Sequence, residues 1–247
     1  MVLADLPYGT TANPWDKPID LERLWQEYER VTVDNGVFAL TSQGLFTASL
    51  IMSNPHIFKY KIVWIKSVAT NYLNAKKQPL RRHEDICIFY RKQPVYNPQM
   101  SNGKAYTATR HSKPNNSYGT HASTTSRSNG LRYPNDVVCH EEDHLYSNTA
   151  VSEGRVSHPN QKPVSLGRYL IRTYSNEGDI ILDNACGSGS FLVAAVLEKR
   201  RFIGIEKNEY ASQFNEPVDY ISICNERLKE ASACNHAANA LQLNFKQ

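Results

Sequence analysis

The sequence predicts an α/β protein: a mainly parallel sheet covered by helices, with a polar inserted lobe. Short apolar runs alternate with segments of helical periodicity before residue 93, and the same alternation resumes after residue 150. Such alternation is typical of a parallel sheet with helices on its faces. Residues 93–135 differ, because they are rich in Ser, Asn, Thr, Pro and Gly and contain no Asp or Glu. We therefore expect three regions: an α/β half at 1–92, an insert at 93–150 and a second α/β half at 151–247.

Each element is expected from its own pattern, in chain order. A short apolar run opens the chain at 1–5, and residues 18–31 repeat apolar side chains at helical spacing, with Asp20 as a suitable N-cap. The patterns that follow in the first half predict a strand at 34–41, a helix at 44–53, and strands at 58–66 and 84–92. The patterns after the insert predict a helix at 162–175, a strand at 179–185, a helix at 190–200, a strand at 201–207 and a helix at 220–231.

Composition and charge narrow the class of protein. With 247 residues, of which 40% are hydrophobic, the chain can bury one sizeable core. Its net charge of +4 permits a polyanionic partner without demanding one. The five cysteines are odd in number and lack C-x-x-C spacing, so neither disulfides nor a zinc ribbon is indicated and a reducing cytoplasm fits best. No apolar run reaches the about 18 residues of a membrane span, and no signal peptide opens the chain.

A glycine turn in the second half carries the pattern of a nucleoside-binding site. The stretch "DIILDNACGSGSFLVAAVLEKRRFIGIE" contains a strand ending at Asp183, the glycines Gly187 and Gly189, a helix, and a second strand followed by Glu206. Glycines let the backbone approach a ligand closely, and ligands of open parallel sheets bind beyond the carboxyl ends of the strands. A carboxylate after the second strand can accept two hydrogen bonds from ribose hydroxyls. The alternative is a tight turn without a ligand; a nucleotide triphosphate is disfavoured, because no G-K-[ST] follows.

Three motifs together resemble one family, the amino-group DNA methyltransferases whose catalytic motif precedes the cofactor motif. "DLPYG" at 5–9 is similar to the catalytic D-P-P-Y, "DNACGSGS" at 183–190 to the methionine-binding turn, and "HPNQKPVSL" at 158–166 to the segment leading into the cofactor pocket. The resemblance covers about residues 1–95 and 155–230. It implies a Rossmann-like methyltransferase sheet, S-adenosylmethionine as cofactor and double-stranded DNA as substrate.

The resemblance implies that "DLPY" does the chemistry. An adenine amino group is a poor nucleophile because its lone pair is delocalised into the ring, so the site must hold the nitrogen with hydrogen-bond acceptors. The family pattern supplies the carboxylate of Asp5 and the main-chain carbonyl of Leu6, where Leu replaces the usual proline, followed by Pro7. Tyr8 is expected to stack on the base, which must first leave the duplex. The alternative for these residues is a solvated strand end beside a core aromatic.

The cofactor residues also follow from the resemblance. Asp183 is expected to meet the methionine amino group and Glu206 to hold the ribose. The residues expected to line the methionine are Gly187, Ser188 and Gly189, and those flanking its end are Lys162 and Pro163, preceded by His158 and Gln161.

Asp at position 5 favours adenine N6 by resemblance, since cytosine-N4 enzymes often carry Ser there. Covalent C5-cytosine chemistry is disfavoured, because no Pro-Cys pair occurs. The alternatives are an N4-cytosine methyltransferase and a catalytically inactive DNA-binding relic. The second is suggested because relatives carry a Gly-Asp turn ahead of the catalytic strand, whereas the printed sequence starts at Met1 inside that strand.

Charged segments outside these motifs suggest partners. The insert carries five cations among four tyrosines, and Lys76, Lys77, Arg81 and Arg82 form a second basic group. We expect the insert to be the target-recognition lobe, with phosphate contacts from such cations. The stretch "HEEDH" at 140–144 has zinc-ligand spacing but lacks an apolar helical pattern, so a surface turn is favoured and no metal is expected. A homodimer and a restriction endonuclease partner are implied by the family alone.

Overall fold

The computed structural model describes residues 1–10, 16–111, 122–138, 161–207 and 218–244, with side chains of the last helix described as far as Ala233. Its contacts divide the chain into two units. The first comprises Met1–Asn97 with Asp136–Gln247, and the second is Pro98–Asn135. Each unit is considered by itself below.

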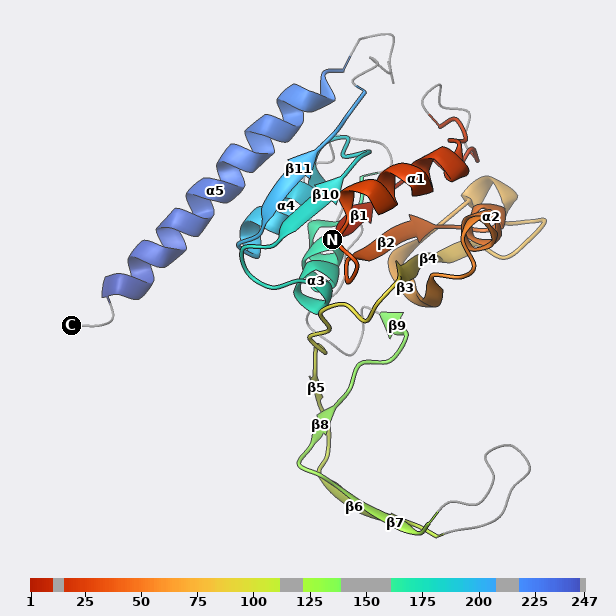
Figure 1. The fold of residues 1–247 in the computed structure, drawn as a ribbon, viewed down its shortest axis with the longest axis vertical. Helices are drawn as coiled ribbons and strands as arrows, with labels where there is room; N and C mark the ends of the chain where they lie inside the picture. The colour runs from red at the N-terminus through yellow and green to blue at the C-terminus, as the bar shows by residue number, and fades with distance from the viewer. Residues whose placement is uncertain (11–15, 112–121, 139–160, 208–217, 245–247) are drawn as a thin grey trace. The chain divides into compact units, whose positions relative to one another are not determined.

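A seven-stranded sheet forms the centre of the first unit (Figure 1). Its strands, in spatial order, are β11 (Arg201–Gly204), β10 (Ile180–Asp183), β1 (Val2–Ala4), β2 (Val37–Ser42), β4 (Arg81–Tyr90), β3 (Phe58–Thr70) and β9 (Val137–Val138). The neighbours from β11 through β2 pair in parallel, as do β3 and β9. Only β4 runs against both of its neighbours. The predicted α/β fold with a mainly parallel sheet is therefore confirmed.

The reversed strand β4 has a simple cause in the chain connection. Residues 71–80 join β3 to β4 and contain only the short 3₁₀ helix η1 (Tyr72–Asn74). A parallel pair needs a crossover of a dozen or more residues, whereas an antiparallel pair needs only a turn. The two strands therefore form a long hairpin, paired from Phe58 opposite Phe89 to Thr70 opposite Arg81.

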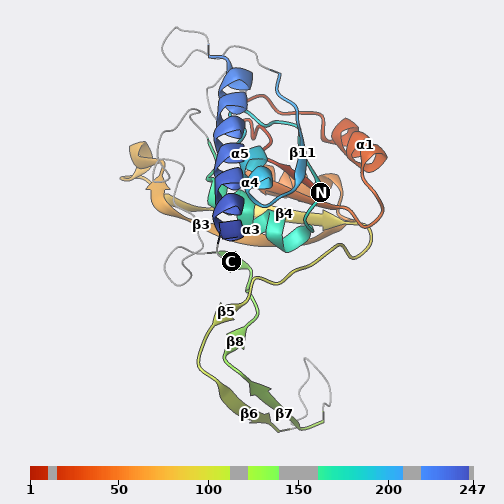
Figure 2. The same cartoon turned by 90° about the vertical axis from the view of Figure 1, so that its left-hand side faces the viewer.

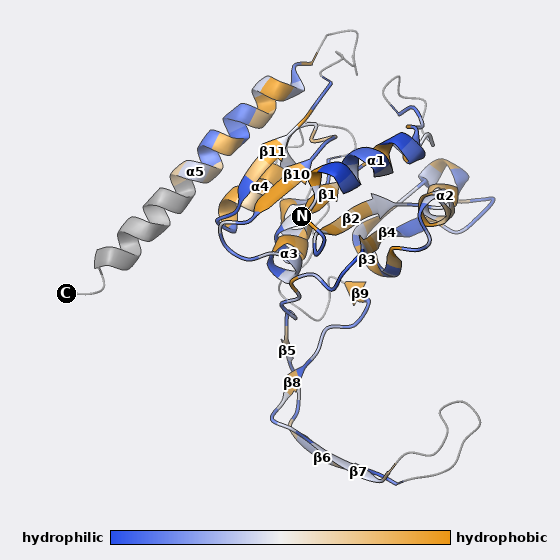
Figure 3. Ribbon diagram, in the orientation of Figure 1, coloured by the Kyte–Doolittle hydropathy of each residue, from blue (hydrophilic) through white to orange (hydrophobic). Residues whose placement is uncertain are grey.

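Helices cover both faces of the sheet (Figure 2). One face packs against α1 (Leu21–Val31) and α2 (Leu45–Ser53), and the other against α3 (Val164–Tyr174) and α4 (Ser190–Leu197). Successive strand residues alternate between the two cores: Phe38 and Leu40 lie with α1, and Val37 and Ala39 with α3. Helix α4 and strand β10 are mostly orange, the colour of apolar residues, in Figure 3. The predicted helices and strands are present, and Asp20 caps α1 by accepting from the Arg23 amide at 3.1 Å.

The last helix, α5 (Tyr220–Asn244), packs against α4. It also contacts the turn that precedes α4, because Gly189, at φ 81°, lies directly against Cys224. A Cβ atom at Gly189 would stand 2.3 Å from the Cys224 sulfur, so only glycine fits. In the described part of the chain, no helix is long and apolar enough to cross a membrane.

The second unit consists of two small antiparallel pairs. β5 (Ser101–Asn102) pairs with β8 (Leu131–Arg132), and β6 (Tyr106–Arg110) with β7 (Thr124–Ser128). The unit lies inside the expected 93–150 insert. Residues just outside it belong to the first unit: Asn97 bonds α3 through the Arg172 carbonyl at 3.1 Å, and β9 joins the large sheet. Target recognition by the insert stays a prediction.

Candidate active site

Three carboxylates gather at the carboxyl ends of neighbouring parallel strands. Asp5 directly follows β1, Asp183 is the last residue of β10, and Glu206 lies two residues beyond β11. Because the three strands are adjacent and parallel, these side chains share one edge of the sheet. That edge is where open α/β sheets bind ligands.

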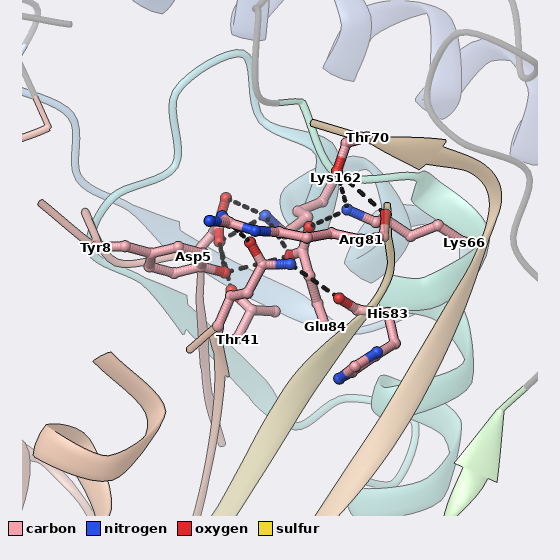
Figure 4. Close-up of polar contacts among 10 residues, drawn as sticks. Asp5, Tyr8, Thr41, Lys66, Thr70, Arg81, His83, Glu84 and Lys162 are labelled. Atoms are coloured by element: carbon pink, nitrogen blue, oxygen red, sulfur yellow. Dashed lines mark hydrogen bonds and ion pairs between the residues drawn. The ribbon is translucent and has the colours of Figure 1, made fainter. Parts of the chain in front are cut away.

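Asp5 is held by donors from three separate parts of the chain (Figure 4). Lys162, just ahead of α3, places its ammonium 2.9 Å from the carboxylate. The Tyr8 hydroxyl donates to Oδ1 at 2.9 Å, and the Thr41 hydroxyl of β2 donates to the same oxygen. The Asp5 side chain keeps 22% of its surface exposed. It is therefore a fixed acceptor that a ligand can reach.

A second carboxylate, Glu84 of β4, extends this network. It lies 3.2 Å from Lys162 and 3.1 Å from Lys66, which also donates to the Thr70 hydroxyl at 3.1 Å. Burial alone lowers the pKa of Lys162, but Asp5 and Glu84 together hold it well above its usual range. Burial alone raises the pKa of Glu84, yet the two lysines bring it below its usual value. The result is two carboxylates alternating with two ammonium groups.

Tyr8 lies between this network and helix α2. Its ring stacks on Phe46 with centroids 5.1 Å apart and an interplanar angle of 24°, and the Lys162 ammonium lies 5.4 Å from the ring centroid. Burial, with the negative charge of Asp5, raises the pKa of the Tyr8 hydroxyl well above its usual range. The hydroxyl therefore stays protonated and acts as a donor.

The glycine turn after β10 forms a separate polar site. The Gly187 amide donates to Glu206 Oε2 at 2.8 Å, and the Ser188 hydroxyl donates to Gln161 at 3.1 Å. Asp183 is 2% exposed and accepts from the Ala185 amide at 3.2 Å. Burial raises the pKa of Asp183 well above its usual range, and the charges of Asp5 and Glu206 add to that effect. A cation arriving here would relieve the cost of the buried carboxylate.

Two features that hold the turn were not found by sequence reasoning. Arg227 of α5 donates to the Ser188 carbonyl at 2.5 Å and to the Ser190 hydroxyl at 3.3 Å. Tyr28 of α1 donates to Asn184, next to Asp183, at 2.6 Å. Neither belongs to a local motif, so only the tertiary fold identifies them.

The structure groups the predicted site residues differently from the sequence. Lys162, expected at the methionine end of the cofactor, contacts Asp5, so it belongs geometrically with the "DLPY" residues; its part in holding a cofactor stays a prediction. Leu6 is buried at 2% exposure, beside the half-buried Pro7. Sequence reasoning missed Thr41, Glu84 and Lys66; "HEEDH" and His158 lie outside the described residues.

The fold and the carboxylates at neighbouring strand ends define an α/β ligand-binding site, and comparison with known proteins gives the family. The sequence matches the family N6_N4_Mtase, described as DNA methylase, over residues 1–216. The protein therefore belongs to the N6/N4 DNA methylase family. Type II methyltransferase M1.MboII of Moraxella bovis is 23% identical over 244 residues, covering 90% of both chains.

Solved structures show the same fold. The M1.HpyAVI–SAM complex gives a TM-score of 0.57 at 20% identity, covering 92% of this chain and 87% of that one. The PvuII DNA methyltransferase, which is cytosine-N4-specific, gives a TM-score of 0.54 at 12% identity, covering 92% of this chain and 85% of that one.

Proposed function

We propose that this protein transfers a methyl group from S-adenosylmethionine to the N6 amino group of adenine in double-stranded DNA. Membership of the N6/N4 family limits the acceptor to an exocyclic amine of adenine or cytosine. The observation that carries the proposal is the fixed, reachable carboxylate of Asp5 at the tip of β1, one strand away from the glycine turn. The choice of adenine rests on aspartate at this position, where N4-cytosine relatives often carry serine.

The glycine turn fits the cofactor. Asp183 is a buried carboxylate whose pKa is raised by that burial, so a ligand ammonium such as the methionine amino group would compensate its charge. Gly187, at φ 49°, carries no Cβ that would keep a ligand from its backbone, whereas Gly189, at φ 81°, is packed against Cys224. Glu206, fixed by the Gly187 amide two residues beyond β11, is the carboxylate that would accept from the ribose hydroxyls. The bound cofactor supplies an electrophilic methyl group on a sulfonium.

The "DLPY" residues would present the amine. Asp5 and the Leu6 carbonyl accept its two N–H bonds, which orients the nitrogen lone pair toward the methyl group. The Tyr8 hydroxyl occupies one Asp5 oxygen at 2.9 Å, so it must turn away when the base enters, and its ring is then available to stack on the base. Lys162 keeps the Asp5 carboxylate in place throughout. The methyl group would pass from the sulfonium to the nitrogen, leaving a neutral thioether, and the surplus N6 proton would pass along the hydrogen bond to Asp5 and on to water.

The proposed DNA contacts include residues outside the Asp5 site. The 98–135 unit, with its cations and polar side chains, would read bases beside the target adenine. A homodimer, an endonuclease partner and a cytoplasmic location stay predictions.

The test is transfer of labelled methyl groups from S-adenosylmethionine to unmethylated duplex DNA, followed by digestion to nucleosides. Labelled N6-methyladenine supports the proposal. Labelled N4-methylcytosine would show that the acceptor is cytosine and not adenine. Absence of transfer together with salt-dependent DNA binding would instead indicate the inactive DNA-binding relic. An Asp5→Ala variant is the control, since it should bind cofactor but transfer nothing.

A further inference from the structure

We infer that the end of the β3–β4 hairpin is a second DNA-binding element, separate from the 98–135 unit, which holds the duplex beside the active site. The hairpin end is defined as residues 67–83. The inference rests on the proposed function for the identity of the partner, duplex DNA. In Figure 1 this end of the hairpin, in light orange, extends past helix α2.

Charge is the first observation. The hairpin end contains Lys76, Lys77, Arg81 and Arg82 and no Asp or Glu. The hairpin end therefore carries a local charge of +4 within 17 residues, as much as the net charge of the whole chain. All four residues are exposed. Such a local surplus matches the phosphate backbone of DNA.

Exposed apolar side chains in the same segment are the second observation. Tyr72 is 76% exposed, Leu73 81% and Val68 60%. Proteins that contact a duplex beside a displaced base use apolar and aromatic side chains against base steps or base faces. A charged surface alone does not require such residues, so their presence points to contact with bases as well as phosphates.

The tip is held in one conformation. Asn71 adopts φ 73°, and the Asn74 amide side chain donates to Asn71 Oδ1 at 2.7 Å. The Ala75 and Lys77 amides donate to the carbonyls of Tyr72 and Asn74 at 3.1 and 2.8 Å. These bonds fix a compact turn, so little ordering is needed when Tyr72 and Leu73 meet a partner.

The base of the hairpin is joined to the active-site network. Lys66 donates to Thr70, where the paired strands end, and contacts Glu84, which contacts Lys162 (Figure 4). Arg81 bonds the Gln43 side chain at 3.2 Å, and Gln43 bonds the His83 carbonyl at 2.8 Å. A duplex that delivers an adenine to Asp5 therefore passes next to the hairpin end.

The electrostatic part is tested by binding of a labelled mixed-sequence duplex to the full chain at several salt concentrations. In Lys76→Gln/Lys77→Gln we expect the slope of log affinity against log salt to shrink by about 1.8, and affinity near about 0.1 M salt to fall about 60-fold. The control is Lys59→Gln/Lys92→Gln, which also removes two exposed lysines. Lys59 lies about 36 Å along β3 from Thr70, at the opposite end of the hairpin.

The apolar part is tested by Tyr72→Ala/Leu73→Ala, with the exposed Val31→Ala/Val33→Ala pair of α1 and its following turn as control. We expect affinity to fall about tenfold with the salt slope unchanged, because no charge is removed. Thermal unfolding should match the wild type in all four variants, since every substituted side chain is exposed.

The outcomes separate this inference from the proposed function. If the wild-type chain methylates DNA but both hairpin variants bind like their controls, the hairpin inference is wrong and the function stands. If the chain transfers no methyl group but the hairpin lysine variant still loses salt slope, the function fails and the hairpin inference stands. Wild-type protein that binds no duplex at all overturns both.

Discussion

Asp5 and Asp183 occupy equivalent places on neighbouring strands and have opposite surroundings. Both follow a short apolar run and lie at the carboxyl end of a parallel strand, β1 or β10. Asp5 contacts the ammonium of Lys162 and two hydroxyls. Asp183 is more deeply buried, and the charged groups that influence it most are the carboxylates of Asp5 and Glu206.

The difference shows that surroundings, not residue type or strand position, decide what a carboxylate does. The charge at the β1 tip is already compensated, so Asp5 is suited to accept hydrogen bonds from a neutral amine. Asp183 is a buried carboxylate with a raised pKa, so it is suited to receive a cationic ligand. Under the proposed function these are the substrate end and the cofactor end of one methyl transfer.

The largest effect is expected from Asp5→Asn. The amide donates where the substrate amine also donates, so methyl transfer should fall about 10³-fold, in the range of a lost catalytic acceptor. Cofactor binding, which depends on the β10 tip, should change less than about threefold. Labelled methyl transfer and calorimetric binding measure the two. Asp34→Asn, at the exposed Lys92 pair, is the control. A loss of cofactor binding in Asp5→Asn would contradict the division between the two tips.

Removing the compensating cation at the β1 tip should be the next most severe change. Lys162→Met keeps the length of the side chain but leaves Asp5 and Glu84 with one ammonium fewer. Removing one partner from a buried ion pair costs about 3 kcal/mol in free energy of unfolding. The exposed Lys199→Met, paired with Glu177 at 3.4 Å, is the control and should cost under about 1 kcal/mol. Urea unfolding measures both, and equal losses would show that the Asp5 network contributes nothing special.

Sequence patterns predicted the fold well because the apolar runs are strong. Alternate side chains of the stretch at 34–41 point toward the two helix layers, and β2 is buried throughout its length. Alternating β and α segments then leave few parallel arrangements. The reversed β4 was not stated in advance, although the absence of a helix between 58–66 and 84–92 contains the reason.

The site was only partly predictable. Asp5, Tyr8 and the glycine turn lie in local motifs, so their spacing alone marks them. Glu84 follows a basic stretch and looks like any strand residue. Only the pairing of β3 with β4 brings it to Lys66, and only the tertiary fold brings Lys162 to it. Arg227 is similarly ordinary on α5 until that helix packs against the turn. Residues that act through long-range contacts leave no signal in a single sequence.

Asp183 is predicted to bind the cationic amino group of the cofactor, and the pH dependence of cofactor affinity tests this. In the folded protein the pKa of Asp183 lies above the about 3.9 of an unstructured aspartate. Below about pH 3.9 Asp183 therefore makes its full contribution to the free energy of unfolding. The contribution is lost as the pH rises through the folded pKa. A bound ammonium favours the ionised form, so cofactor affinity should increase with pH over the same window.

Asp183→Asn should therefore bind S-adenosylmethionine about 30-fold more weakly than the wild type at a pH where Asp183 is ionised, and its affinity should depend little on pH. Calorimetry between about pH 5 and 7 measures this, where the amino group of the ligand stays charged. Asp34→Asn again serves as the exposed control. A wild-type affinity that falls with pH would mean that Asp183 is not the group that meets the ammonium.

The smallest effect is expected at the neighbouring strand end, from Glu206→Gln. The glutamine oxygen can still accept from the Gly187 amide, which Glu206 now does at 2.8 Å, but one acceptor for the ribose hydroxyls becomes a donor. Cofactor affinity should fall about tenfold, the cost of one charged hydrogen bond, and its rise with pH should move to lower pH, because the Glu206 charge that helps to raise the pKa of Asp183 is gone. Glu177→Gln, on the exposed surface, is the control. Unchanged affinity in Glu206→Gln, together with a loss in Asp183→Asn, would confine cofactor recognition to β10 and place the ribose away from β11.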